Sequence, residues 1–192
     1  MTLRRSLVLL GLGLAVLAAS VLGYRTGRRV ADPQVRGAGP AAAAARPGPS
    51  DWLQIPAPDV AFRTLDGGEA RLAELRGRVV LVNFWGTWCP PCLVEIPDLI
   101  RAQARLEPMG ATIVGPAIDS GTPQEIRAFV EEMGINYPIW IGRDVEAVSR
   151  FGAPGYPFTL LIDREGVIRR SYIGPQTEAN LLGDVATLLA GF

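Results

Sequence analysis

Histidine and lysine are both missing from the 192-residue chain, and cysteine occurs only twice. Without histidine the chain can build neither a Ser-His-Asp triad nor a Cys-His nucleophile pair. Two cysteines cannot complete a four-ligand structural zinc site, which leaves only an unusual site of two cysteines and carboxylates. The 19 basic and 19 acidic residues give a formal net charge of zero, which indicates no nucleic-acid partner. We therefore expect no metal and no nucleic-acid partner. We also expect no other cofactor and a monomeric protein.

The two cysteines, Cys89 and Cys92, are separated by Pro90 and Pro91. They follow an apolar run at residues 79–85, and a helical pattern begins directly after Cys89. A C-x-x-C motif where a strand leads into a helix is typical of a thiol–disulfide redox site. The alternatives are a structural disulfide and a pair of inert thiols. A bridge that closes so short a loop constrains the unfolded chain very little, so it would stabilise the fold poorly. The motif therefore favours redox chemistry.

Residues 6–24 contain no charged side chain and, at about 1.5 Å per residue in a helix, can cross a hydrocarbon core. Arg25, Arg28 and Arg29 follow at once, so we expect a signal-anchor over residues 1–29. The small residues at 18–20 keep a cleaved signal peptide open as the alternative. Arginines flank both ends, so the positive-inside rule does not orient the segment. The redox motif favours an oxidising compartment for the folded part.

Residues 30–57 are rich in proline, glycine and alanine without an amphipathic period, so we expect a flexible linker there. A folded domain is expected over residues 58–192. The patterns predict strands at 60–65, 69–72, 79–85, 111–119, 158–162 and 167–173, with an extended stretch at 136–141. They predict helices at 90–106, 123–133, 144–150 and 177–189. This alternation predicts a mixed sheet covered by helices.

The segment FWGTWCPPC at residues 84–92, together with this order of elements, resembles the thioredoxin superfamily. Within it, the chain is similar to the membrane-tethered bacterial TlpA, ResA and CcmG (DsbE) proteins. Glu95 and Pro97 continue the motif as C-x-x-C-x-x-E-x-P, and YPFTLLID at residues 156–163 resembles the family's cis-proline loop. The resemblance implies an α/β thioredoxin fold, three-layered around a mixed central sheet. It also implies an N-terminal β-hairpin extension and a single preceding transmembrane helix.

The peroxiredoxins have a similar fold and a different cysteine motif, P-x-x-x-T/S-x-x-C. Here Gly86 occupies the Thr/Ser position, and no proline precedes it at the required distance. The sequence therefore disfavours peroxidase chemistry.

The residues and the resemblance together predict a division of roles between the cysteines. At a helix N-terminus, unpaired N–H groups and the helix dipole stabilise a thiolate, so we expect a lowered pKa and a nucleophilic role for Cys89. Cys92, about one turn further along, would resolve the mixed disulfide. Glu95 lies about one turn beyond Cys92 on the same side of the helix. By spacing alone it could be a solvated residue, and the resemblance favours it as the acceptor of the Cys92 proton.

In plain thioredoxin a buried aspartate of the central strand moves this proton. The matching residue here is Asn83, which cannot titrate, so the resemblance points again to Glu95. It also implies that Pro157 follows a cis peptide bond and that the backbone of Tyr156 pairs with an extended client peptide. The expected client-binding residues are Trp88, Pro90, Pro91, Tyr156 and Pro157.

The sequence and the resemblance thus predict a thiol–disulfide oxidoreductase anchored in a bacterial inner membrane, with its catalytic domain in the periplasm. The expected activity is reduction of a disulfide in a client protein, either apocytochrome c or a copper-delivery protein. A membrane electron donor of the DsbD/CcdA type would reduce it again. The alternatives are a disulfide oxidase or isomerase, and a tethered Cu(I) metallochaperone that uses the dithiol as ligands.

Overall fold

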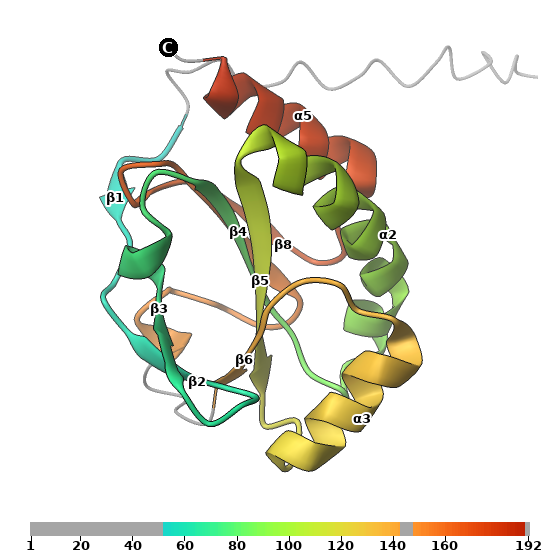
Figure 1. Cartoon of the computed structure of the whole chain (residues 1–192). Coiled ribbons are helices and arrows are strands. Elements are labelled where there is room, and N and C mark those ends of the chain that lie inside the picture. The colour runs from blue at the N-terminus through green and yellow to red at the C-terminus, as the bar shows by residue number, and fades with distance from the viewer. Residues whose placement is uncertain (1–51, 143–147, 191–192) are drawn as a thin grey trace, which may run out of the picture. The chain divides into compact units, whose positions relative to one another are not determined.

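The computed structural model describes residues 52–142 and 148–190 of the chain. These residues form a mixed sheet with the strand order β1-β8-β7-β4-β5-β6-β2-β3. Figure 1 labels all of these strands except β7. The strands are β1 (Ile55–Pro56), β2 (Ala61–Thr64), β3 (Glu69–Arg71), β4 (Val79–Phe84), β5 (Ala111–Ile118), β6 (Ile139–Gly142), β7 (Phe158–Ile162) and β8 (Val167–Ile173). The helices are α2 (Pro90–Leu106), α3 (Pro123–Met133) and α5 (Glu178–Leu189), with 3-10 turns η2 (Leu72–Leu75) and η3 (Glu107–Met109).

Strand β4 lies inside the sheet, and all of its residues are buried. It pairs in parallel with β5 and antiparallel with β7, with Asn83 opposite Thr159. Alternate strand residues face opposite sides, so Leu81 packs with the helices while Val82 packs on the other face. The same alternation places Asn83 on the helical side.

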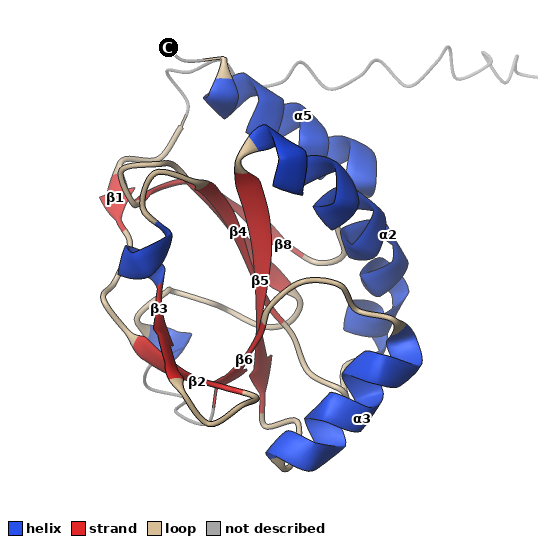
Figure 2. Ribbon diagram, viewed as in Figure 1, coloured by secondary structure: helices blue, strands red, loops and turns tan. Residues whose placement is uncertain are grey.

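Helices α2, α3 and α5 all cover one face of the sheet, as Figure 2 shows. Leu99, Ile126 and Leu181, one from each helix, belong to a single apolar cluster with residues of β4 and β5, which we call the helical cluster. The opposite face packs against Phe62 of β2 and Phe151, whose rings lie 6.1 Å apart. Because β4, β5 and β6 run parallel, their carboxyl ends meet at one edge of the sheet, where α/β proteins commonly place their sites.

Local signals in the sequence set the helix boundaries. Thr122 caps α3 by accepting a hydrogen bond from the N–H of Glu125, and Gly134 ends the helix in the left-handed conformation. Helix α2 begins at Pro90, where a missing N–H is harmless. The bounds predicted for α2, α3, β7 and β8 are confirmed.

The domain boundary predicted at residue 58 is wrong, because the fold already includes residues 52–57. Trp52 is buried in the helical cluster, and the N–H of Leu53 donates to the carbonyl of Arg169. Ile55 and Pro56 then pair with β8 as an antiparallel edge strand. A two-residue strand inside a proline-rich stretch has no detectable period, so the composition suggested a linker instead.

Two other predictions concern residues outside the described ranges. The anchor expected at residues 1–29 lies wholly outside them, as does most of the helix expected at 144–150. Within residues 52–142 and 148–190, no helix combines the length and apolarity needed to cross a membrane.

Candidate redox site

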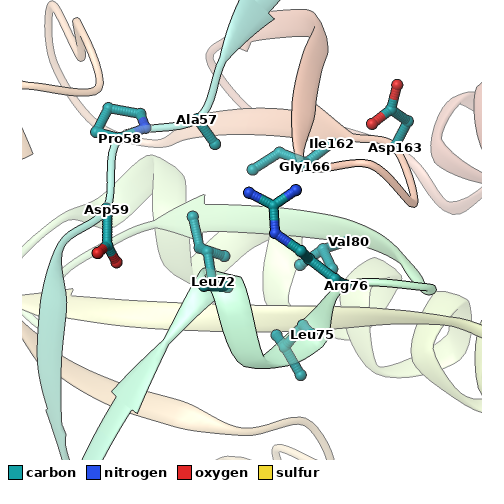
Figure 3. A pocket seen from close by; sticks show the side chains of 11 residues that line it. Ala57, Pro58, Asp59, Leu72, Leu75, Arg76, Val80, Ile162, Asp163 and Gly166 are labelled. Atoms are coloured by element: carbon teal, nitrogen blue, oxygen red, sulfur yellow. The ribbon is translucent and has the colours of Figure 1, made fainter.

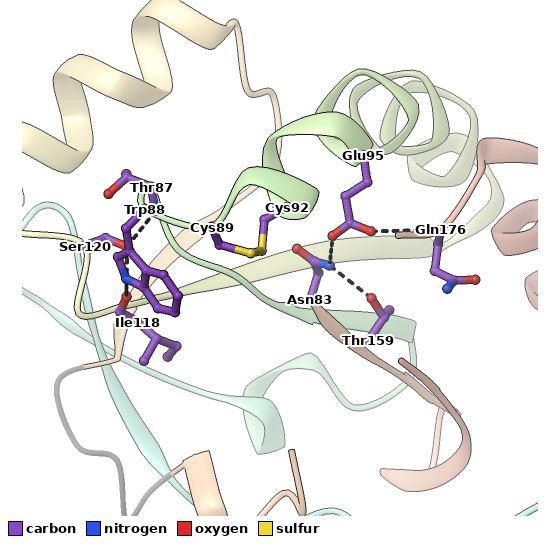
Figure 4. The surroundings of a disulfide bond; sticks show 10 residues. All are labelled: Asn83, Thr87, Trp88, Cys89, Cys92, Glu95, Ile118, Ser120, Thr159 and Gln176. Atoms are coloured by element: carbon purple, nitrogen blue, oxygen red, sulfur yellow. Dashed lines mark hydrogen bonds between the residues drawn. A yellow bond between two sulfur atoms is a disulfide. The ribbon is translucent and has the colours of Figure 1, made fainter. Parts of the chain in front are cut away.

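The two cysteines form a disulfide where β4 leads into α2, with their Cα atoms 5.3 Å apart (Figure 4). Cys89 is the N-cap residue of α2, and Cys92 lies in its first turn. Both side chains are buried against the helical cluster. The strand-to-helix context predicted for the motif is therefore present.

The two prolines change the electrostatics of this helix N-terminus. Pro90 and Pro91 occupy the first two helical positions, so neither contributes an N–H group. The next two backbone donors, the N–H groups of Cys92 and Leu93, both donate to the Cys89 carbonyl, at 3.0 and 3.2 Å. A Cys89 thiolate would thus be stabilised mainly by the helix dipole and little by backbone hydrogen bonds.

Glu95 is buried beneath the surface, with only 1% of its area exposed. Its Oε1 accepts from the side chain of Asn83 at 2.7 Å, and its Oε2 accepts from the backbone N–H of Gln176 at 2.9 Å. Burial raises the pKa of Glu95 to about 7, although these two hydrogen bonds lower it and the nearby Asp98 raises it further. A carboxyl group with a pKa near neutrality can both accept and release a proton.

Asn83 connects the central strand to this carboxyl group. Besides bonding to Glu95, its Nδ2 donates to Oγ1 of Thr159 at 3.0 Å across the β4–β7 pair. All three side chains are almost fully buried. The residue that replaces thioredoxin's aspartate is therefore joined directly to the acid expected to replace its function.

Trp88 is the exposed aromatic residue beside the disulfide, with 53% of its area accessible, whereas Trp85 is buried. Its Nε1 donates to the carbonyl of Ile118 at 3.0 Å, and its ring meets that of Tyr156 edge-on at 5.7 Å. A Cβ on Gly86 would lie 2.7 Å from the Trp88 ring, so this position requires glycine.

The other residues predicted to bind a client surround the same end of β4. The Tyr156–Pro157 peptide bond is cis, and Phe158 pairs with Phe84 at the end of the central strand. Pro90 and Pro91 are exposed at the start of α2. The structure therefore brings Trp88, Tyr156 and the cysteine loop together.

A cleft of about 370 Å³ adjoins this loop at the carboxyl ends of β5 and β6. Ala117, Ile126 and Ile141 supply apolar walls, and Asp119 lies at its rim. Ser120, which also lines the cleft, accepts a hydrogen bond from the N–H of Thr87 at 3.1 Å.

A second pocket lies near the amino end of β4, whereas the cysteines follow its carboxyl end (Figure 3). The side chain of Arg76 extends into it and donates to the carbonyl of Glu165. Asp163, at its edge, is held by the N–H groups of Glu165 and Val167 and by Arg169. These contacts are structural. Within the described ranges, no group of three or more cysteine or acidic side chains converges to hold a metal.

The fold and the dithiol at this position define a thioredoxin-fold thiol–disulfide oxidoreductase. Residues 53–171 match the AhpC/TSA family, and the chain belongs to that family. Its likeness is to the TlpA/ResA/CcmG group within this fold, as the resemblance implied. The peroxiredoxin motif remains absent, because Gly86 still occupies its Thr/Ser position.

Among curated relatives, the thiol-disulfide oxidoreductase ResA of Geobacillus thermodenitrificans is 34% identical over 126 residues, which cover 65% of this chain and 71% of the relative. ResA of Bacillus anthracis is 32% identical over 127 residues, covering 66% and 73%. A solved thiol:disulfide interchange protein of the thioredoxin family from Chlorobium tepidum is 31% identical with a TM-score of 0.63, covering 71% of this chain and 97% of that one. A proposed DsbE protein from the same species is 25% identical with a TM-score of 0.65 and the same coverage.

Two contacts of the site could not be read from the sequence. The N–H of Gln176 is a backbone donor, so its side chain gives no signal of its role. The contact of Asn83 with Glu95 had a partial signal, since a polar residue inside a buried strand needs a buried partner. The sequence placed Asn83 correctly but did not identify that partner.

Proposed function

We propose that the chain reduces a disulfide in a client protein, with Cys89 as nucleophile and Cys92 as resolving thiol. The Cys89 thiolate attacks one client sulfur, which breaks the client disulfide, forms a mixed disulfide and releases one client thiolate. Cys92 then gives its proton to Glu95, and its thiolate attacks the sulfur of Cys89. This releases the second client thiolate and leaves the Cys89–Cys92 disulfide, so two electrons pass to the client.

The observation that carries the reducing direction is the position of the two prolines. They remove two N–H donors from the start of α2, where a thiolate would otherwise be stabilised. A strong disulfide oxidant depends on a stabilised reduced form, and this site lacks part of that stabilisation. The buried carboxyl group of Glu95 acts in the same direction, since a negative charge nearby opposes thiolate formation.

We further propose that residues 1–29 anchor the chain in a bacterial inner membrane and that a tether connects them to a periplasmic redox domain. The uncharged run at residues 6–24 and the likeness to ResA support this arrangement. The proposed client is apocytochrome c or a copper-delivery protein, and the proposed electron donor is a membrane protein of the DsbD/CcdA type. Fractionation tests the anchor: the full chain is expected in the membrane fraction, and a chain lacking residues 1–29 outside it.

Trapping of the mixed disulfide tests the reaction and identifies the client. In full chain carrying Cys92→Ser, the client is expected to stay joined to Cys89, where mass spectrometry after non-reducing purification identifies it. The matched control is Cys89→Ser, which leaves Cys92 buried and is expected to capture nothing. Capture by Cys89→Ser but not by Cys92→Ser would reverse the assignment of the two cysteines. Capture by neither would contradict the proposed reductase function.

A further inference from the structure

We propose that Asn83 is a positioning residue of the redox site. Its side-chain oxygen accepts a hydrogen bond from the S–H group of Cys92 when the disulfide is reduced. In this arrangement one amide group holds both partners of the proton transfer: Oδ1 binds the resolving thiol, and Nδ2 holds Glu95. The inference rests on the dithiol function proposed above and adds the residue that presents Cys92 to its base.

The hydrogen bonds of Asn83 leave one atom unused. Its Nδ2 donates to Glu95 at 2.7 Å and to Thr159 at 3.0 Å, so both N–H bonds have acceptors. Its Oδ1 is buried and has no hydrogen-bond partner. An amide oxygen accepts up to two hydrogen bonds, and a buried acceptor without any is costly. The oxidised site therefore contains one buried hydrogen-bond acceptor without a donor.

The free oxygen lies on the side of the amide that faces the cysteines. Asn83 lies on the helical face of β4 between Leu81 and Trp85, which directly follows the strand, and both of these pack in one cluster with Cys92. Cys92 and Glu95 are one turn apart on α2 and both are buried. Figure 4 shows Nδ2 of Asn83 toward Glu95 and Oδ1 toward the disulfide.

Reduction creates the missing donor. A disulfide sulfur carries no proton, whereas a reduced Cys92 carries an S–H group, which is a weak hydrogen-bond donor. A hydrogen bond to the neutral thiol disfavours the thiolate, so Asn83 keeps Cys92 protonated while the dithiol waits for a client. During resolution the S–H bond breaks, the electron pair stays on sulfur, and the proton passes to a carboxylate oxygen of Glu95.

Two other ionisable groups, Asp98 and Tyr137, interact electrostatically with Glu95. The charge of Asp98 on α2 raises the pKa of Glu95, and Asp98 itself accepts hydrogen bonds from Arg101 and from the N–H of Glu178. Tyr137, ahead of β6, has a buried hydroxyl without a hydrogen-bond partner. Burial, and then the charge of Glu95, raise the pKa of Tyr137, so it stays neutral. Tyr137 is thus the matched comparison for Asn83: a second buried polar group near the site with an unused atom.

The test measures the titration of Cys92 in the reduced full chain. Because the chain has only two cysteines, labelling cysteine with ¹³Cβ gives two NMR signals that follow pH. In Asn83→Leu the acid dissociation constant of Cys92 is expected to rise about three- to tenfold, the size expected for one lost hydrogen bond. In Tyr137→Phe it is expected to stay within about twofold of wild type.

Substitution of Asn83 also removes a donor from Glu95, so the comparison is repeated with Glu95→Gln present in both chains. If Oδ1 acts on the thiol directly, Asn83→Leu still shifts the titration of Cys92 in that background. A shift that disappears there, or an equal shift in Tyr137→Phe, would overturn the proposal.

If Asn83→Leu does not fold, the wild-type chain supplies the readout. The ¹³Cγ signal of Asn83 is expected to move with the titration of Cys92, and a constant signal would overturn the proposal. None of these measurements needs a client. If Asn83 accepts the hydrogen bond from Cys92 but the protein reduces no client, the proposed function is contradicted and the role of Asn83 is not.

Discussion

Glu95 links the redox site to the stability of the oxidised protein. Its pKa is 4.5 in the unfolded chain and about 7 in the fold, so folding favours its protonated form. Between these values the folded state binds the extra proton, so this contribution is complete below about pH 4.5 and is lost as pH rises through 7. The loss amounts to about 3 kcal/mol at most. We therefore expect the contribution of Glu95 to lower the free energy of urea unfolding at pH 8 relative to pH 5.

Other carboxyl groups also contribute to the pH dependence of stability, so the control is Glu95→Gln. In that variant, the part of the decrease in the free energy of unfolding between pH 5 and pH 7.5 that Glu95 causes is expected to disappear. This holds whatever the stability of the variant at a single pH. Identical slopes in the two proteins would mean that Glu95 titrates normally and is not the buried acid of the site.

Pro91 determines how well the helix N-terminus stabilises a Cys89 thiolate. Pro91→Ala restores one N–H donor at an exposed position in the first turn. We expect the pKa of Cys89 in the reduced protein to fall by up to about one unit, as a donor near an ionised group is worth about 1 kcal/mol. The pH dependence of alkylation measures this. Pro97→Ala, the same change at an exposed position further along α2, is the control and is expected to leave that pKa unchanged.

Edge strand β1 and Trp52, three positions ahead of it, extend the domain beyond its predicted start. Trp52 is buried in the helical cluster, and the guanidinium of Arg170 lies 6.0 Å from its ring centre. We expect Trp52→Ala to lower the free energy of unfolding by about 3 kcal/mol, the range for a buried tryptophan. Ile55→Ala, at a half-exposed position in β1, is expected to cost under about 1 kcal/mol. A loss of under about 1 kcal/mol for Trp52→Ala as well would mean that residues 52–57 do not belong to the fold.

At the scale of elements, the sequence predicted those whose ends carry chemical signals. Helix α3 has Thr122 and Gly134 at its ends, and α2 starts at a proline, so these residues mark the helix boundaries in the sequence. Apart from Asn83, strand β4 is apolar on both faces, which is typical of an interior strand. The pairing of β2 with β6 and of β1 with β8 depends on tertiary contacts between residues far apart in the chain. Short stretches carry no pattern that reveals such pairing.

At the scale of the whole molecule, the thioredoxin fold and the dithiol were predicted because a short motif in a fixed context carries them. The environment of Glu95 was not, because it depends on three segments meeting: α2, β4 and the loop at Gln176. Spacing alone could place Glu95 near Cys92, but only the fold shows that it is buried. The buried acid and the Asn83 contact are thus properties of the assembled domain.

The direction of electron flow is the central proposal for the molecule, and the reduction potential of the Cys89–Cys92 pair tests it most directly. Equilibration of the full chain with defined ratios of reduced and oxidised glutathione, followed by thiol quantification, gives this potential. We predict a value close to that of thioredoxin, about −270 mV, and more negative than the roughly −180 mV of protein disulfide isomerase. A value near the roughly −120 mV of a strong disulfide oxidant would contradict the reductase function.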